Sequence, residues 1–131
     1  MYVLDTNTLI YFFKGMGKVS EKFLDISPKE IGIPSVVLYE LEYGIAKSTS
    51  PRKRQAQLKE LCSLVAVLPF DNETASLSVL IRINLEKKGV PIGPHDVLIA
   101  GTTLANQGVL VTNNTKEFSR VPKLKLDNWY K

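Results

Sequence analysis

The chain opens with Tyr2-Val-Leu-Asp-Thr-Asn7, a short apolar run that leads directly into three polar residues. A run of this kind suits a strand that is buried on both faces of a sheet. Asp, Thr and Asn side chains accept hydrogen bonds from the free amides of a helix's first turn, so a helix should begin here and continue through Leu9 to Lys14. The stretch therefore predicts a buried strand followed at once by a helix.

The same alternation of strands and helices continues along the chain. Further strands are expected at 31–33, 65–70, 109–111 and 123–126. Further helices are expected at 20–26, 35–47 with Pro34-Ser35 as its cap, 51–64, from Asp71 or Asn72 to 88, and 96–107. In the helix ending at 88, Leu77, Leu80, Ile81 and Leu85 should share one buried face. Such alternation predicts an α/β fold with a central, mostly parallel β-sheet flanked by helices on both faces.

Length and composition fit one globular domain over residues 1–131. The sequence is 44% hydrophobic, and no run approaches the length of a membrane span. Its start does not resemble a signal peptide, and Cys62 is the only cysteine, so we expect a cytoplasmic protein without an internal disulfide. The net charge of +4 favours a polyanionic partner, although it also fits a merely well-solvated basic protein.

Three acidic residues stand out: Asp5 after the first strand, Glu40 within the helix at 35–47, and Asp96 at the start of the helix at 96–107. Taken singly, Asp5 and Asp96 are explained well as helix caps. Glu40 has apolar neighbours one turn away and would need a cation or hydrogen-bond donors if buried. Glu42 has similar neighbours, so periodicity does not choose between the two glutamates.

In parallel α/β sheets, ligands bind beyond the carboxyl ends of the strands, where these acids are expected. If the three carboxylates meet there, their repulsion calls for a divalent cation. Oxygen ligands suit Mg²⁺ or Mn²⁺, and the chain has too few cysteines and histidines for a zinc site. Such a site suits the hydrolysis of phosphodiesters.

Four blocks of sequence resemble the PIN domains of the VapC toxin family. They lie in the family's order and spacing and span nearly the whole chain: Leu4-Asp-Thr-Asn7, Leu38-Tyr-Glu-Leu-Glu-Tyr-Gly44, Ile92-Gly-Pro-His-Asp-Val-Leu-Ile-Ala100 and Val111-Thr-Asn-Asn-Thr-Lys-Glu-Phe118. The resemblance implies that Asp5, Glu40 and Asp96 are catalytic and hold Mg²⁺ or Mn²⁺. It leaves Glu42 as a surface or interface residue.

The resemblance also suggests supporting residues. Thr6 and Thr112 would orient carboxylates or water. Asn114 stands where many PIN domains carry a fourth acid, and we count it among the catalytic candidates. Glu117 lies one helical turn further along the chain. Because Asn114 replaces an acid, one bound metal ion is the safer expectation.

The remaining candidates are less specific. Two basic clusters could bind RNA or could simply be solvated: Lys47, Arg52, Lys53 and Arg54, and Lys116, Arg120, Lys123 and Lys125. Tyr11, Phe12 and Phe13 could stack on bases, although helix packing explains at least two of them better. We expect His95 not to be the general base, and Cys62 to be a core residue rather than a nucleophile.

The resemblance implies an endoribonuclease that cleaves in line, leaving a 5′-phosphate and a 3′-hydroxyl. The blocks Gly93-Pro-His-Asp96 and Thr112-Asn-Asn-Thr115 are most similar to the enterobacterial branch that cuts tRNA, with the anticodon loop of initiator tRNA as the leading expectation. The family further implies the toxin of a type II toxin–antitoxin system, a homodimer, and a VapB antitoxin that blocks the acidic site, forms a larger hetero-oligomer and binds operator DNA.

Two alternatives remain open from the sequence. A phospho-receiver signalling module would use Asp5, Asp71 and Thr112, but the chain lacks the adjacent acid pair and the lysine typical of receivers. The other alternative is a PIN fold that acts on structured DNA or serves as an inactive scaffold. The three intact acids argue against inactivity, but the sequence does not separate RNA from DNA as substrate.

Overall fold

The computed structural model describes residues 1–131. Its centre is a five-stranded sheet in the order β3-β2-β1-β4-β5, and every neighbouring pair of strands is parallel. The strands are β1 (Tyr2–Leu4), β2 (Ile31–Pro34), β3 (Ala66–Leu68), β4 (Val109–Val111) and β5 (Lys125–Asp127). The prediction of a mostly parallel sheet is confirmed.

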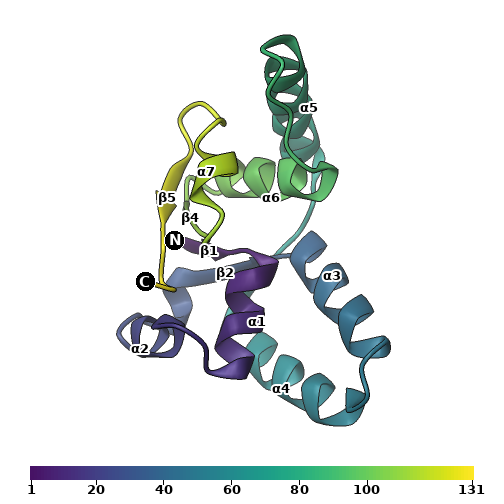
Figure 1. The fold of residues 1–131 in the computed structure, drawn as a ribbon, viewed down its shortest axis with the longest axis vertical. Coiled ribbons are helices and arrows are strands. Elements are labelled where there is room, and N and C mark those ends of the chain that lie inside the picture. Colours follow the sequence, from purple (N-terminus) through teal and green to yellow (C-terminus); the bar gives the residue numbers. More distant parts are fainter.

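Seven α-helices surround the sheet: α1 (Thr6–Lys14), α2 (Val19–Leu24), α3 (Ser35–Ala46), α4 (Pro51–Leu64), α5 (Asn72–Lys87), α6 (Pro94–Ala105) and α7 (Thr115–Phe118). A short 3₁₀ helix spans Pro28–Glu30. Figure 1 shows α1, α3 and α4 on one side of the strands, and α5, α6 and α7 on the other. The α/β class with helices on both faces is therefore confirmed.

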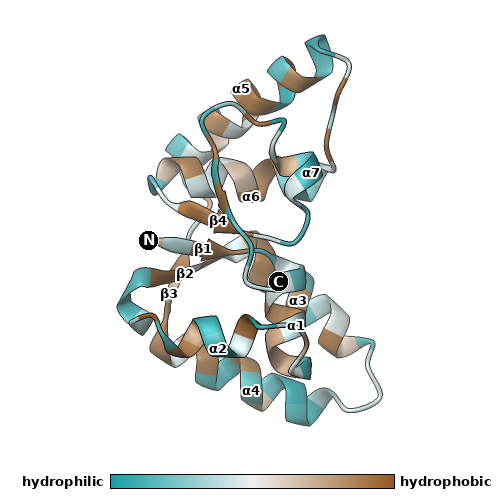
Figure 2. Ribbon diagram, turned by 60° about the vertical axis from the view of Figure 1, so that its left-hand side comes forward, coloured by the Kyte–Doolittle hydropathy of each residue, from teal (hydrophilic) through white to brown (hydrophobic).

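The core is centred on β1, which lies between β2 and β4. Val3 is opposite Gly32 of β2 and Leu110 of β4, and the Val3 and Leu110 side chains are fully buried. Figure 2 shows the strands as the apolar centre of the molecule. Trp129, near the C-terminus, is also buried, and its ring centroid lies 5.6 Å from that of Tyr2. The end of the chain thus closes one edge of the core.

Several element boundaries differ from the predictions. Helix α6 begins at Pro94 rather than Asp96, because proline suits the first helical position, and α7 was not expected. Of the predicted cap Pro34-Ser35, Pro34 occupies the cap position of α3, but no side chain caps the helix. The strand expected at 65–70 covers only Ala66–Leu68.

Helix α5 also differs from its prediction. Ile81 and Leu85 are buried. Leu80 is 65% exposed, and Val79 and Ile83 are exposed as well. Helix α5 packs mainly against α6 and projects beyond the sheet, so only a narrow stripe of it is covered (Figure 1). The prediction that Leu80 faces the core is wrong, and an exposed apolar surface takes its place.

The strand order excludes the receiver hypothesis. Receiver-like folds have the order 2-1-3-4-5, whereas this sheet has the order 3-2-1-4-5. Asp71, the acid that hypothesis required, caps α5: its Oδ1 accepts hydrogen bonds from the Thr74 amide and hydroxyl at 2.9 and 2.8 Å. Hydrogen bonding to Thr74 lowers the pKa of Asp71.

None of the helices combines the length and the apolar character needed to cross a membrane.

Candidate active site

The site lies beyond the carboxyl ends of β1 and β4. These strands are neighbours, with Leu4 opposite Val111, so the residues that follow them, Asp5 and Thr112, come side by side. The Asp5 amide donates to the Val111 carbonyl at 3.2 Å. Parallel pairing thus joins two parts of the chain that are more than a hundred residues apart in sequence.

Asp5 has two roles at this position. It is the N-cap of α1, and its Oδ1 accepts a hydrogen bond from the Thr8 amide at 2.9 Å. It is also buried, and burial raises the pKa of its carboxyl group; hydrogen bonds from Thr112 and Thr8 partly offset this effect. The cap therefore holds a carboxylate in a place where its charge is poorly solvated.

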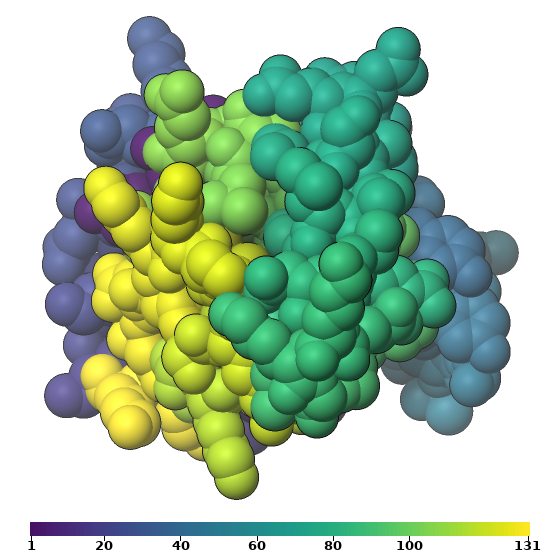
Figure 3. All heavy atoms as spheres, turned by 90° about the horizontal axis from the view of Figure 1, so that it is seen from above, coloured from purple at the N-terminus to yellow at the C-terminus, as the bar shows by residue number.

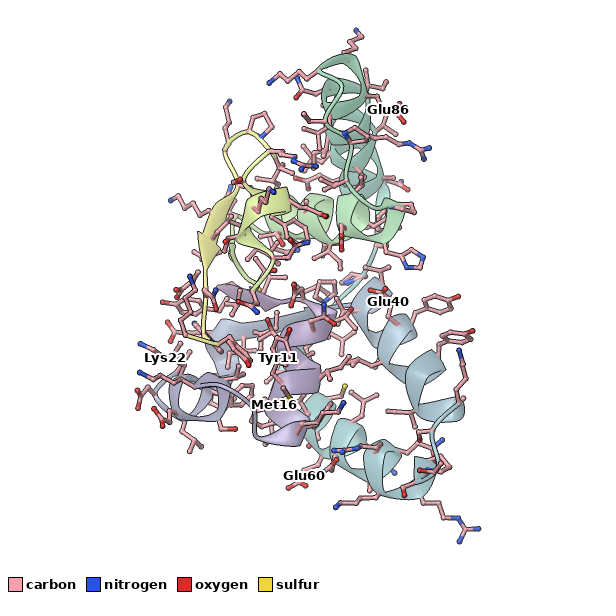
Figure 4. All side chains as sticks on the ribbon, in the orientation of Figure 1. Tyr11, Met16, Lys22, Glu40, Glu60 and Glu86 are labelled. Atoms are coloured by element: carbon pink, nitrogen blue, oxygen red, sulfur yellow. The ribbon has the colours of Figure 1, made fainter.

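Glu40 approaches the same region from α3. Figure 4 labels it on the part of α3 that lies below α6. Its Oε1 accepts a hydrogen bond from the Thr6 hydroxyl at 2.7 Å, and His95 Nδ1 lies 3.1 Å from its Oε2. The side chain is 28% exposed. Both carboxylate oxygens thus have partners, one from α1 and one from α6, and the direction of the side chain is fixed.

Asp96 lies in the first turn of α6, where the helix dipole favours an anion. Burial raises its pKa to about 6, and the charges of Asp5, Glu117 and Glu40 add to this effect. No protein group donates a hydrogen bond to its carboxylate. A Cβ on Gly93 would lie only 3.3 Å from Asp96 Oδ2, so the missing side chain at Gly93 gives the carboxylate room.

Glu117 adds a fourth carboxylate. It lies on α7, and its charge is the second-largest electrostatic contribution to the raised pKa of Asp96, after that of Asp5. Asn114 Nδ2 donates to Glu117 Oε2 at 3.2 Å, and the Asn114 amide donates to the Thr112 hydroxyl at 3.0 Å. Asn114 thus links the end of β4 to Glu117, so the site has a fourth acid although residue 114 is an amide.

The donor set suits a hard divalent cation, since it consists of carboxylate oxygens and neighbouring hydroxyls. The raised pKa of Asp96 and the lack of any hydrogen-bond donor to its carboxylate show that His95 and the helix dipole offset burial and the neighbouring negative charges only in part. As the side chains stand, no three acidic, histidine or cysteine residues are close enough together to hold a metal ion. The carboxylates would have to move closer to one another around an ion.

The basic candidates lie on separate elements, and one of them, Arg54, lines a hollow together with Glu40. Lys47, Arg52 and Lys53 are exposed at the end of α3 and the start of α4, whereas Arg54 is half-buried and donates to the Phe13 carbonyl at 3.2 Å. In the other cluster, Lys116, Lys123 and Lys125 are exposed, and Arg120 donates to the Pro91 carbonyl at 3.1 Å.

The structure reveals two contributors that the sequence analysis did not assign. Thr8 donates its amide to Asp5, and its place three residues after a capping aspartate is the signal that could have found it. His95 contacts Glu40, a contact that depends on the packing of α6 against α3 and has no signal in the sequence. Glu42 is exposed, and Cys62 is half-buried beside the core, where burial raises the pKa of its thiol.

Comparison with known proteins agrees with this fold. The PIN domain family matches residues 2–124. The tRNA(fMet)-specific endonuclease VapC of Salmonella typhimurium is 35% identical, over 98% of this chain and 97% of its own. Ribonuclease VapC2 of Rickettsia felis is 38% identical, over 100% of this chain and 99% of its own.

A solved structure extends the comparison to three dimensions. The crystal structure of Rickettsia felis VapBC2 bound to a DNA fragment from its promoter contains a chain with a TM-score of 0.91 and 36% identity, with 98% of each chain covered. The chain belongs to the PIN-domain family and, within it, to the VapC proteins.

Proposed function

We propose that this protein is the toxin of a type II toxin–antitoxin system and acts as a Mg²⁺- or Mn²⁺-dependent endoribonuclease. One observation carries the proposal: the charges of Asp5, Glu117 and Glu40, from the end of β1, from α7 and from α3, add to burial in raising the pKa of Asp96, whose carboxylate accepts no hydrogen bond from the protein. Carboxylates that repel one another in this way favour a bound divalent cation.

Asp5, Glu40 and Asp96 are the proposed ligands, and a bound ion would lower the pKa of water and stabilise charge on the phosphodiester. Thr6 and His95 hold Glu40 through its two oxygens, and Thr112 and Thr8 hold Asp5. Asn114 donates a hydrogen bond to Glu117, whose charge acts on Asp96. The chain's own contribution is to bring these carboxylates to one region of the fold and to orient Glu40 and Asp5, and the carboxylates still have to move closer together around an ion.

The proposed substrate is tRNA, with the anticodon loop of initiator tRNA as the first candidate. The relative from Salmonella typhimurium is named for tRNA(fMet), and this chain shares nearly its full length. The net charge of +4 and the exposed lysines and arginines at 47, 52, 53 and 116 suit a polyanion.

The proposed partner is a VapB-type antitoxin, which would block the acidic site, assemble with the toxin into a hetero-oligomer and supply the contacts to operator DNA. The similar chain from Rickettsia felis was crystallised in a VapBC complex with promoter DNA. The proposed location is the bacterial cytoplasm, where tRNA is found.

A homodimer is also part of the proposal. Phe70, Val79, Leu80 and Ile83 are exposed on α5 and just before it. Figure 3 views the molecule from the side on which α5 lies, beside the C-terminal segment. Neighbouring exposed apolar side chains of this kind commonly mark a protein interface. A second copy of the chain is the proposed occupant.

The proposed activity is tested by incubating total tRNA with antitoxin-free protein in Mg²⁺ or Mn²⁺, with and without EDTA, beside an Asp5→Asn variant. We expect discrete fragments from the wild type alone, abolished by EDTA, with ends that identify the tRNA and the cleaved bond. A 5′-phosphate and a 3′-hydroxyl are the expected ends.

Failure to cleave any RNA, despite measurable binding of Mn²⁺, would contradict the proposal. Cleavage of structured DNA by the same preparation would then support the alternative PIN nuclease. Fragments that persist in Asp5→Asn and also resist EDTA would instead indicate a contaminating ribonuclease.

A further inference from the structure

A hollow of about 250 Å³ opens beside the acidic site, between α1, α3 and α4. Glu40 forms part of its wall, so the hollow is continuous with the proposed active site. Its volume lies just below the roughly 300–1,000 Å³ of clefts that enclose drug-sized ligands, which suits a group about the size of a nucleotide base. Its lining includes Ile10, Phe13, Lys14, Glu40, Gly44 and Arg54.

Two cations at the hollow have no anionic partner. The ion pairs of the protein are Arg82 with Glu86 and His95 with Glu40, and neither involves Lys14 or Arg54. Hydrogen bonds from Arg54 Nη1 to the Phe13 carbonyl and to Gln57 Oε1, at 3.2 and 3.0 Å, hold the guanidinium in place. Its Nε and Nη2 groups remain available, and they suit a phosphate.

The floor of the hollow is apolar and includes an aromatic ring. Ile10, Phe13, Leu41 and Ile45 supply it. The neighbouring aromatic residues are engaged elsewhere: the Phe12 ring stacks on Phe23, and the Tyr11 ring packs against Tyr130. The Phe13 ring centroid also lies 5.7 Å from that of Phe12, and Phe13 is the member of this aromatic run that lines the hollow.

Gly44 lines the hollow from within α3 and is exposed. A Cβ built on it would meet no atom within 4 Å, so there is open space beside it. Helical glycine costs about 1 kcal/mol relative to alanine. We call the open edge of the hollow at Gly44 its mouth, and a large side chain at this position would occupy it.

We propose that this hollow binds one nucleotide of the RNA strand next to the phosphodiester that is cleaved, with the base on Phe13 and the apolar floor and a phosphate at Arg54 and Lys14. The inference rests on the proposed ribonuclease function. A strand whose phosphate lies at Glu40, Asp5 and Asp96 must continue over the adjacent surface, and the hollow is that surface on the α3 side. Unpaired cations beside an aromatic floor match a nucleotide better than an apolar peptide.

The test is RNA binding without cleavage, measured by fluorescence anisotropy in EDTA with a short labelled single-stranded RNA of mixed sequence. Gly44→Leu fills the mouth of the hollow, and Ala46→Leu adds the same side chain at an exposed position of α3 outside it. We expect Gly44→Leu to weaken RNA binding on the order of tenfold, the scale of one lost base–aromatic stack, and Ala46→Leu to retain wild-type affinity.

A second pair of variants tests the cations. Arg54→Gln removes the guanidinium at the hollow, and Lys59→Gln removes an exposed charge elsewhere on α4. We expect Arg54→Gln to lower affinity and to reduce the slope of log K against log salt by about 0.7, the value for one phosphate contact on a single strand. Lys59→Gln should leave the slope unchanged. This pair decides the question if Gly44→Leu does not fold, which thermal unfolding will show.

Wild-type RNA affinity in Gly44→Leu, or no RNA binding by the wild type, would overturn the proposal. Gly44→Leu that binds RNA normally but escapes inhibition by the antitoxin would assign the hollow to the antitoxin and would overturn it too. These outcomes are separate from failure of the ribonuclease: a wild type that binds RNA through the hollow in EDTA, yet never cleaves RNA in Mn²⁺, contradicts the proposed activity alone.

Discussion

Asp96 is the residue that shows most clearly how unfavourable it is to place several carboxylates near one another. It is partly buried, three other carboxylates lie near enough to affect its charge, and no protein group donates a hydrogen bond to it. A carboxylate in this setting is destabilised in its charged form. A bound cation would therefore stabilise the charged form of Asp96. In the metal-free protein, the stability of the fold should depend on pH because of this residue.

The first prediction concerns the stability of the metal-free protein. The pKa of Asp96 is about 6 in the folded state against an ordinary value of 3.8, so its favourable contribution is present below about pH 4 and is lost as the pH rises through about 6. Asp5 is shifted in the same direction. In EDTA, the melting temperature should fall between about pH 4 and pH 7, and Mg²⁺ should reduce the fall.

Asp96→Asn provides the control, since it removes the titrating charge and nearly preserves the shape of the side chain. Its melting temperature should vary less with pH than that of the wild type, and its cleavage activity should be lost. Equal pH dependence in the two proteins would contradict the assignment of the raised pKa to Asp96.

At the scale of elements, three of the four acids lie in or beside the first turn of a helix. Asp5 caps α1, Asp96 lies in the first turn of α6, and Glu117 lies in the short α7. These positions favour anions through free amides and the helix dipole, which partly offsets the repulsion among the acids. The Asp5 side chain thus caps α1 and is also a proposed metal ligand. Substitutions can separate these two roles.

The second prediction makes this separation at Asp5. Asp5→Asn keeps an oxygen that can accept from the Thr8 amide, whereas Asp5→Ala leaves that buried amide without a partner. We expect Asp5→Ala to lower the free energy of unfolding by about 1 kcal/mol or more, the usual cost of a lost cap, and Asp5→Asn to be at least as stable as the wild type. Both should lack cleavage activity.

Urea unfolding in EDTA measures this difference. Equal stability of the two variants would mean that the cap contributes little to α1. Activity retained in Asp5→Asn would show that the charge of Asp5 is not needed for cleavage.

At the scale of the whole molecule, α5 is the element least covered by the rest of the chain. It packs against α6 on one side and leaves Val79, Leu80 and Ile83 exposed on the other. The sheet is already covered by α6 on this side (Figure 1), so α5 has little further surface of the same chain against which to pack. A second copy would bury these side chains.

The third prediction is that Leu80→Glu disrupts a dimer. Placing a charge among apolar side chains in an interface is costly, so the variant should be monomeric by light scattering at a concentration at which the wild type is dimeric. Leu24→Glu on α2 is the matched control, because Leu24 is 83% exposed and lies away from α5. A wild type that is itself monomeric, or a dimeric Leu80→Glu, would contradict the proposed interface.

The sequence by itself determined the succession of strands and helices, the cap at Asp5 and the three candidate acids. These features depend on neighbours in the chain: apolar spacing, proline and glycine positions, and side chains that reach amides a few residues away. Choosing Glu40 over Glu42 required the family resemblance, because both have the same local setting. The short α7 and the exposure of Leu80 were missed because local patterns carry no information on what covers an element.

Only the tertiary structure decided the strand order, the contact of His95 with Glu40, the effect of Glu117 on Asp96, and the hollow beside Glu40. Each of these joins elements that are distant in sequence, such as α3 with α6 or α1 with α4. Their distances follow from how helices pack on the twisted sheet, and that packing is set by the whole core together. The candidate acids could therefore be named from the sequence. Their arrangement in space, and the hollow next to it, could not be predicted from it.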